Sequence, residues 1–187
     1  ILYINMGDNY GVIMPGDLKV VNTKVSAATY QDISGSNFTT VGVDNSIKVG
    51  NGCLGLYTGA GTSFNGKPIC AVVDLKGSMP YGDTCLSGGF RVRNKLNQDS
   101  QTVQLRVQPL TVTVPVAKNT SIYTTPYVAT NINYKTGDPK TSFGNYTGVS
   151  TKVGKASVFV EGQLYDLTKV NKNTIGINAG VSIPIGG

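Results

Sequence analysis

The sequence contains no histidine and no tryptophan, and only 14% of its 187 residues are charged. Histidine is the usual general base for a serine or cysteine nucleophile, and no nucleophile elbow surrounds any serine. Paired carboxylates among Asp74, Asp83 and Asp99 would require the fold to bring them together, and their spacing favours binding or turn roles. We therefore expect a protein that is not an enzyme.

Cysteine is scarce, with three residues at Cys53, Cys70 and Cys85. Their spacing fits no zinc site, and without histidine little remains to complete one, so we expect no metal and no cofactor. One disulfide and one free thiol is the simplest arrangement. It implies an oxidising compartment.

Long apolar runs are also missing, because no stretch approaches the roughly 20 residues that a helix needs to cross a bilayer. The chain begins at Ile1 without a signal-peptide pattern. These features predict a processed, soluble chain with no membrane insertion. The net charge is +6, but lysine and arginine are scattered, and their longest series is the alternating Arg91, Arg93 and Lys95. This predicts a solvated basic surface and no nucleic-acid partner.

Glycine, valine, threonine and tyrosine are abundant, and Glu161 is the only glutamate, which favours sheet and turn over helix. The clearest period-two alternation predicts a half-buried strand through Ile175, Ile177, Ala179, Val181, Ile183 and Ile185. Further strands are expected at 41–49, 69–75, 122–134 and 156–160. Turns are expected at 58–66, 78–82, 96–99, 136–144 and 171–173.

A reversal of parity occurs near Pro109. Val103, Leu105 and Val107 alternate in one phase, and Leu110, Val112, Val114 and Val116 follow in the opposite phase. A bulge or bend is therefore expected near the proline. Eight or more short strands describe an all-β sandwich or barrel, and 1–187 are expected to form a single domain that ends at a flexible joint.

Several ordered segments resemble a known family. They are Cys53 to Leu56, then Gly82 to Thr84, then Ser100 to Pro109, with similar opening and closing segments at 3–15 and 181–187. Together they resemble the lectin domain of the F17-type fimbrial tip adhesins. That family consists of two-domain adhesins of chaperone-usher pili, which recognise receptors containing N-acetylglucosamine.

The resemblance implies an immunoglobulin-like β-sandwich with a sugar site built from three loops. The family's sugar site contains a tryptophan, and this chain has none. Phe90 or Tyr81 would therefore have to supply the apolar platform for the sugar ring. The implied disulfide joins Cys53 to Cys85, with Cys70 to Cys85 as the alternative. The implied carbohydrate-binding residues are Asp44, Asp83, Thr84, Phe90, Ser100 and Gln101.

The resemblance also implies a place and a role. The chain would be a secreted lectin domain at the fimbrial tip on the bacterial surface, exported through the periplasm. It would mediate host attachment and virulence through a host glycan or glycoprotein receptor, with a pilin domain and fimbrial subunits as partners. Taken alone, Gly82 and Asp83 after Pro80 also fit an ordinary turn.

Two other classes compete with the lectin. The first is a self-polymerising fibre subunit that donates the strand at 1–6 or 175–185 to a neighbour. The second is a small outer-membrane barrel, suggested by the alternating last strand. It ranks last because the sequence has no aromatic girdles and no terminal aromatic residue, and because it contains cysteines.

Overall fold

The computed structural model describes residues 2–6, 9–13, 20–64, 69–96 and 102–185. No helix long and apolar enough to cross a membrane occurs within these ranges. The structure consists of strands joined by turns and loops. The strands are β1 (Leu2–Met6), β2 (Asn9–Ile13), β3 (Val20–Asp32), β4 (Asn37–Val49), β5 (Gly52–Thr62), β6 (Ile69–Tyr81), β7 (Thr84–Lys95), β8 (Thr102–Ala117), β9 (Thr120–Asn133), β10 (Pro139–Val153), β11 (Ala156–Leu164) and β12 (Ile175–Pro184).

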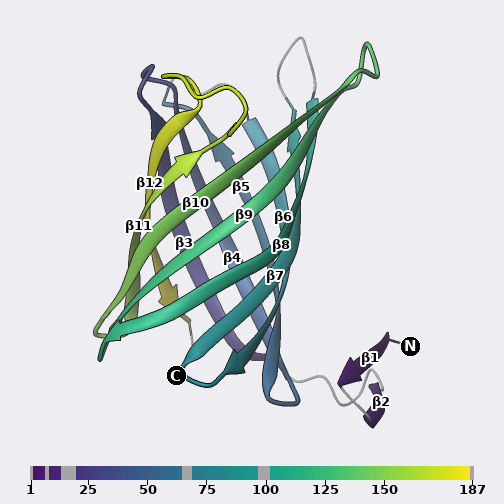
Figure 1. Ribbon diagram of the computed structural model, residues 1–187, viewed down its shortest axis with the longest axis vertical. Coiled ribbons are helices and arrows are strands. Elements are labelled where there is room, and N and C mark those ends of the chain that lie inside the picture. The colour runs from purple at the N-terminus through teal and green to yellow at the C-terminus, as the bar shows by residue number, and fades with distance from the viewer. Residues whose placement is uncertain (1, 7–8, 14–19, 65–68, 97–101, 186–187) are drawn as a thin grey trace.

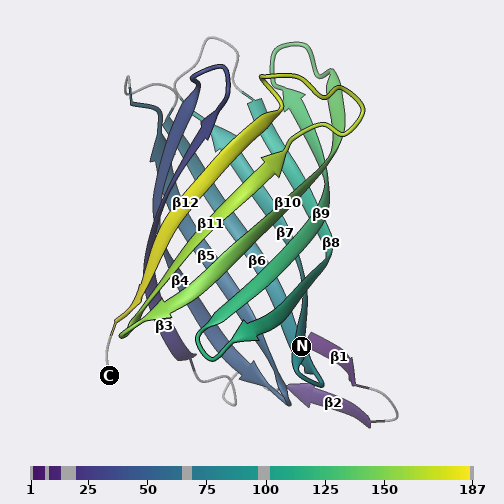
Figure 2. The ribbon, with the colours of Figure 1, turned by 60° about the vertical axis from the view of Figure 1, so that its left-hand side comes forward.

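Strands β3 to β12 form one closed barrel in which every strand pairs antiparallel with its neighbours in sequence (Figures 1 and 2). Closure comes from β12 pairing with β3, which brings Gly176 opposite Asp32 and Pro184 opposite Lys24. β1 and β2 pair only with each other, as a separate two-stranded sheet. The predicted immunoglobulin-like sandwich is therefore wrong. Alternation predicts an apolar face on each strand, and it does not state whether the strands form two facing sheets or one closed sheet.

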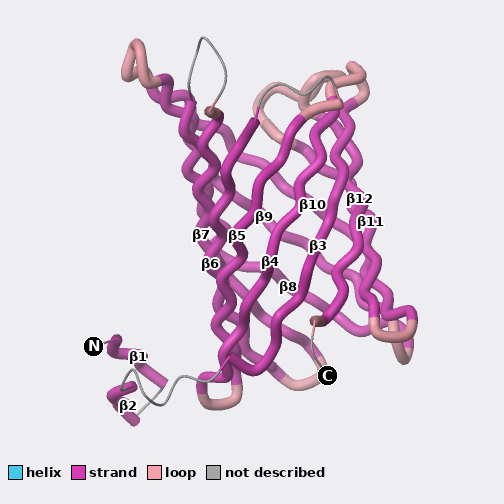
Figure 3. Tube along the Cα trace, turned by 180° about the vertical axis from the view of Figure 1, so that it is seen from behind, coloured by secondary structure: helices cyan, strands magenta, loops and turns pink. Residues whose placement is uncertain are grey.

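The two ends of the barrel differ in their connections (Figure 3). At one end, which we call the turn end, the hairpins close with the residue pairs 50–51, 82–83, 118–119 and 154–155. Gly50, Gly82 and Gly154 have positive φ, as tight hairpin turns require. At the other end, which we call the loop end, the connections are longer and run over 33–36, 63–68, 96–101, 134–138 and 165–174.

The expected strands at 41–49, 69–75 and 156–160 lie within β4, β6 and β11. The strand expected at 122–134 corresponds to β9, and the strand expected at 175–185 corresponds to β12, each of which ends one residue earlier than expected. The bulge near Pro109 is confirmed, because the register of β8 against β9 shifts between Val107 and Val112. The strands are longer than expected. Residues 58–62, 78–81 and 139–144 were expected in turns and belong to β5, β6 and β10.

Candidate functional site

The charged residues of the barrel strands all share one face. Residues that line the interior alternate along each strand, and every charged residue in the described parts of β3 to β12 has this interior parity. This set comprises Lys24, Asp32, Asp44, Lys48, Asp74, Lys76, Arg91, Arg93, Lys95, Arg106, Lys140, Lys152 and Glu161. The interior of the barrel is thus the charged side of the wall.

The outer face is apolar. Ile177 is 61% exposed and Val160 is 52% exposed, although both are branched aliphatic side chains within strands that the sequence predicts. Exposed valine, leucine, isoleucine and phenylalanine continue around the barrel on the same parity. A belt of this kind cannot face water over a whole molecule without association, so the outer wall requires an apolar surrounding.

The buried residues are largely polar. Asp74, Arg106 and Gln108 are each 2% exposed and Thr125 is fully buried. The few buried apolar residues include the cluster of Tyr127, Ala129 and Tyr146. A water-soluble domain would have the opposite distribution, so the barrel is inverted relative to one.

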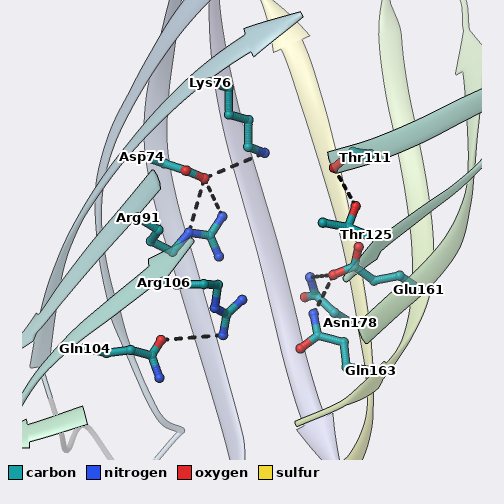
Figure 4. Close-up of polar contacts among 10 residues, drawn as sticks. All are labelled: Asp74, Lys76, Arg91, Gln104, Arg106, Thr111, Thr125, Glu161, Gln163 and Asn178. Carbon is teal, nitrogen blue, oxygen red and sulfur yellow. Dashed lines mark hydrogen bonds and ion pairs between the residues drawn. The ribbon is translucent and has the colours of Figure 1, made fainter. Parts of the chain in front are cut away.

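One side of the interior, formed by β6, β7 and β8, is basic, and we call it the basic wall (Figure 4). Arg91 of β7 donates two hydrogen bonds to Oδ2 of Asp74 on β6, from Nε at 3.1 Å and from Nη2 at 2.6 Å. The Lys76 ammonium lies 3.6 Å from the same oxygen. Oδ2 of Asp74 is therefore shared by two cations, and the closer contact is the pair of hydrogen bonds from Arg91.

Arg106 and Arg93 lie on the same wall without a carboxylate partner in the described structure. The Arg106 guanidinium stacks 4.2 Å from the ring centroid of Tyr127, and its Nη2 lies 3.5 Å from Oε1 of Gln104. The Arg93 guanidinium lies 5.3 Å from the ring of Phe38. Cation–π contacts hold both groups, and their charge is not neutralised.

The opposite side of the interior carries Glu161 of β11 (Figure 4). Tyr123 donates a hydrogen bond to its Oε2, and Asn178 and Gln163 donate hydrogen bonds to its Oε1. All three donors are neutral. The carboxylate is thus fully hydrogen-bonded while its negative charge remains.

The interior holds two cavities. The larger, about 630 Å³, runs between the basic wall and Glu161, and the smaller, about 570 Å³, lies at the loop end beside Asn37, Phe64 and Lys95. Both are lined by Tyr30, Phe38, Arg93 and Tyr165. Tyr30 and Tyr165 contact each other edge to face, with ring centroids 5.0 Å apart. These four side chains are where the two cavities adjoin.

The loop that carries Tyr165 is held by its own hydrogen bonds. The backbone N–H of Tyr165 donates to the Thr174 carbonyl, and that of Leu167 donates to the Phe143 carbonyl. In the same loop, hydrogen bonds from the Thr168 side chain and backbone lower the pKa of Asp166 below its ordinary value. The loop is thus ordered at both of its ends.

The structure does not bring the predicted sugar-binding residues together. Asp44 lines the interior of the barrel, and Asp83 lies in a two-residue turn at the turn end, followed by Thr84 at the start of β7. Phe90 lies on the outer face and is 42% exposed. Ser100 and Gln101 lie outside the described residues.

The three cysteines are free. Cys53 lies on β5 and Cys85 on β7, with β6 between them, and two strand spacings of roughly 9–10 Å exceed the roughly 7 Å that a disulfide can bridge. Cys70 lies near the loop end of β6, whereas Cys85 lies near the turn end of β7. Neither pairing is formed.

The interior residues were visible in the sequence as charges at alternate positions. Arg91, Arg93 and Lys95 alternate with Phe90 and Val92. The same pattern in Val73, Asp74, Leu75 and Lys76 places charge on one face of a strand and apolar groups on the other. Taking these lysines and arginines as a scattered surface missed this signal.

No protein-family model and no curated protein sequence matches this chain. Among solved structures, the NanC porin is similar with a TM-score of 0.53 and 14% sequence identity, over 87% of this chain and 100% of that one. The two proteins share the fold of a closed antiparallel β-barrel. A loop-deletion mutant of OmpT, an outer membrane protein of Vibrio cholerae, matches with a TM-score of 0.47 and 13% identity, over 80% of this chain. The chain spans 54% of the length of that protein.

The closed barrel corrects the adhesin hypothesis. The likeness to the F17-type lectin domain was wrong, and with it the roles in cell adhesion, the pilin and fimbrial partners and the fimbrial tip. The chain is rich in glycine, asparagine and threonine, and its short motifs occur in the same order as in that family. The chain does not form the β-sandwich that would bring those motifs together in space. The strand-donating fibre subunit is wrong as well, because the fold is a closed barrel. Of its two expected donor segments, β12 is paired on both edges within the barrel, and β1 pairs with β2 of the same chain.

The prediction of no membrane insertion is also wrong. It depended on the missing helix-length apolar run, whereas a barrel strand crosses a bilayer with roughly 9–11 residues of alternating character. The alternative ranked last in the sequence, a small barrel, has the observed architecture. The absence of aromatic girdles and of a terminal aromatic residue argued against a barrel. The placement of every charged strand residue on one face was the stronger signal, and it favoured one.

Proposed function

We propose that this chain is a bacterial outer-membrane β-barrel that forms a passage for small hydrophilic solutes. The observation that carries the proposal is the distribution of side chains across the barrel wall, which is the reverse of that in a water-soluble domain. All described charged residues of β3 to β12 have interior parity, and the outer face is apolar. Lipid satisfies the outer face, and water in the interior hydrates the inner one.

The dimensions of the barrel agree with this proposal. Its strands run from 9 residues in β11 to 16 residues in β8. A tilted strand needs roughly 9–11 residues to cross the hydrocarbon layer, so every strand is long enough. Closure leaves no unpaired strand edge in the membrane, where an unsatisfied backbone group is costly.

The connections support one orientation. Barrels of this class place their short turns in the periplasm and their longer loops outside the cell. The turn end would therefore face the periplasm, and the loop end, with Tyr165 and the smaller cavity, would face outward. The chain would reach the outer membrane by export through the periplasm, and its role would need no catalysis.

Single-channel recording tests the proposal. The purified chain, refolded in detergent and added to a planar lipid bilayer in potassium chloride, is expected to give discrete, repeated current steps. Addition of detergent alone, or of the heat-unfolded chain, is the control and should give none. A barrel that inserts into liposomes, resists trypsin and carries no current would contradict the passage and leave only an anchoring role.

A further inference from the structure

The basic wall of the barrel has more cations than it can neutralise. On β6, β7 and β8 the interior face carries Asp74 as the only described anion. The cations on the same face are Lys76, Arg91, Arg93, Lys95 and Arg106. Glu161 across the interior is hydrogen-bonded to neutral donors and forms no ion pair within the described structure.

The register places two of these cations side by side. Arg91 of β7 is directly opposite Arg106 of β8, on the same face of the sheet. Like charges at directly opposed positions destabilise a strand pair. Asp74 pairs with Arg91 and Lys76 and not with Arg106, so no ion pair within the described residues offsets the cost of holding Arg106 beside Arg91.

The wall also presents buried donors without acceptors. Nε of Arg106, Nε of Arg93 and Nε2 of Gln108 are buried and make no hydrogen bond. Arg106 and Gln108 are each 2% exposed. A buried polar group without a partner is uncommon and costs roughly 1–3 kcal/mol. Nitrogen donors on a positively charged wall are complementary to the oxygens of an anion.

Aromatic rings surround the same groups. Tyr127 lies under the Arg106 guanidinium and Phe38 lies near that of Arg93, while Tyr165 lines both cavities beside Arg93. A planar guanidinium binds the two oxygens of a carboxylate or a phosphate together. The rings offer apolar faces to the carbon skeleton that carries the charged group.

We propose that the interior wall of β7 and β8 is a binding site for small organic oxyanions. Arg106 and Arg93, which line the larger cavity, would bind the carboxylate or phosphate group, and Phe38 and Tyr165, which line the same cavity, would contact its carbon skeleton. The larger cavity of about 630 Å³ has room for such a molecule. Lys95 at the loop end places a further positive charge at the outer mouth. This inference rests on the proposed passage and names the solutes that it favours.

The test combines ion selectivity with block of the channel by two carboxylates of equal charge. In a potassium chloride gradient, the reversal potential of the wild-type channel should show a preference for chloride over potassium. Benzoate should reduce the current at lower concentration than acetate, because only benzoate carries a ring. Arg106→Gln should raise the half-blocking concentration of benzoate about tenfold, as expected for the loss of a charge-assisted hydrogen bond.

Two variants control for charge and for folding. Lys152→Gln makes the same change of charge on the interior parity of β10 near the turn end, and should leave the benzoate block unchanged. Arg106→Lys keeps the charge and removes the planar donor pair, so it should keep the chloride preference and weaken the block. If Arg106→Gln does not fold, Arg93→Gln takes its place with the same expectation.

The possible outcomes separate the two proposals. A channel that conducts but prefers potassium, or on which benzoate and acetate act alike, would overturn the oxyanion site and leave the passage intact. If no channel forms, the folded barrel in detergent still decides the question. Benzoate should raise the Tm of the wild type and not that of Arg106→Gln, and equal Tm shifts in both would overturn the site.

Discussion

At the scale of single residues, glycine and tyrosine fit together across the interior wall. A Cβ at Gly144 would overlap the ring of Tyr127, and a Cβ at Gly176 would overlap the ring of Tyr30. The missing side chain therefore makes the space that an interior ring occupies. This explains part of the high glycine content, which taken from the sequence alone predicts turns.

The first prediction concerns this contact. Gly144→Ala should lower the free energy of unfolding by about 1–3 kcal/mol, because the Tyr127 ring or the backbone of β10 must shift. Gly162→Ala is the matched control, since its Cβ would meet nothing within 4 Å. Urea unfolding in lipid vesicles measures both variants. Equal losses would show that the ring does not need the space.

The second prediction concerns the buried ion pair. Asp74→Asn should destabilise the barrel by about 3 kcal/mol, because it leaves Arg91 on the interior wall without an anion. Lys76→Gln is the control, because its ammonium is more distant at 3.6 Å and the side chain is 48% exposed, so it should cost less than about 1 kcal/mol. Unfolding curves in the same vesicles compare the two. A larger loss for Lys76→Gln would contradict the assignment of Arg91 as the main partner.

At the scale of elements, the sequence predicted where many strands lie, but the interpretation of which face of each strand is buried was wrong. Ile177 was expected on a buried face and is exposed on the outer wall. Period-two alternation is the same whether the apolar side faces a core or a bilayer. The charged positions on the other face were the deciding signal.

Strand β5 shows a different limit. Gly59 and Gly61 lie in the segment 58–66 that was expected to form a turn, although both belong to β5 of the barrel wall. At Gly59 and Gly61 an added Cβ would collide with neighbouring side chains and backbone. The need for glycine there arises from the backbone and Phe38 ring of the neighbouring strand β4, which only the tertiary structure brings near, and from the ring of Tyr57 on β5 itself.

The third prediction uses two neighbouring residues of β10. Val149 is on the outer face and 45% exposed, whereas Ser150 lines the larger cavity. Val149→Arg should destabilise the folded barrel in a bilayer by about 2–4 kcal/mol, because the guanidinium would enter the hydrocarbon layer. Ser150→Arg should be tolerated. The refolded fraction in vesicles, measured by heat-modifiable migration, separates the two, and an equal effect would argue that Val149 does not face lipid.

At the scale of the whole molecule, closure of the barrel was beyond the reach of the sequence. It depends on β12 pairing with β3, between residues more than a hundred positions apart such as Ile183 and Val25. Nothing in the local pattern of either strand specifies that partner. For the same reason, the sequence could not show that the adhesin-like motifs lie apart in space. Only their order along the chain was visible.

The central claim is that the barrel wall separates lipid from water at successive residues. Labelling of adjacent positions on β3 tests it most directly. Ser26 lines the larger cavity and Ala27 has the opposite parity. Each is replaced by cysteine in a chain whose native cysteines are serine, and the protein is refolded into liposomes. A charged, membrane-impermeant thiol reagent is expected to label Ser26→Cys rapidly and to leave Ala27→Cys unlabelled until detergent is added. Equal labelling of both in intact liposomes, or labelling of Ala27→Cys alone, would contradict the inverted barrel.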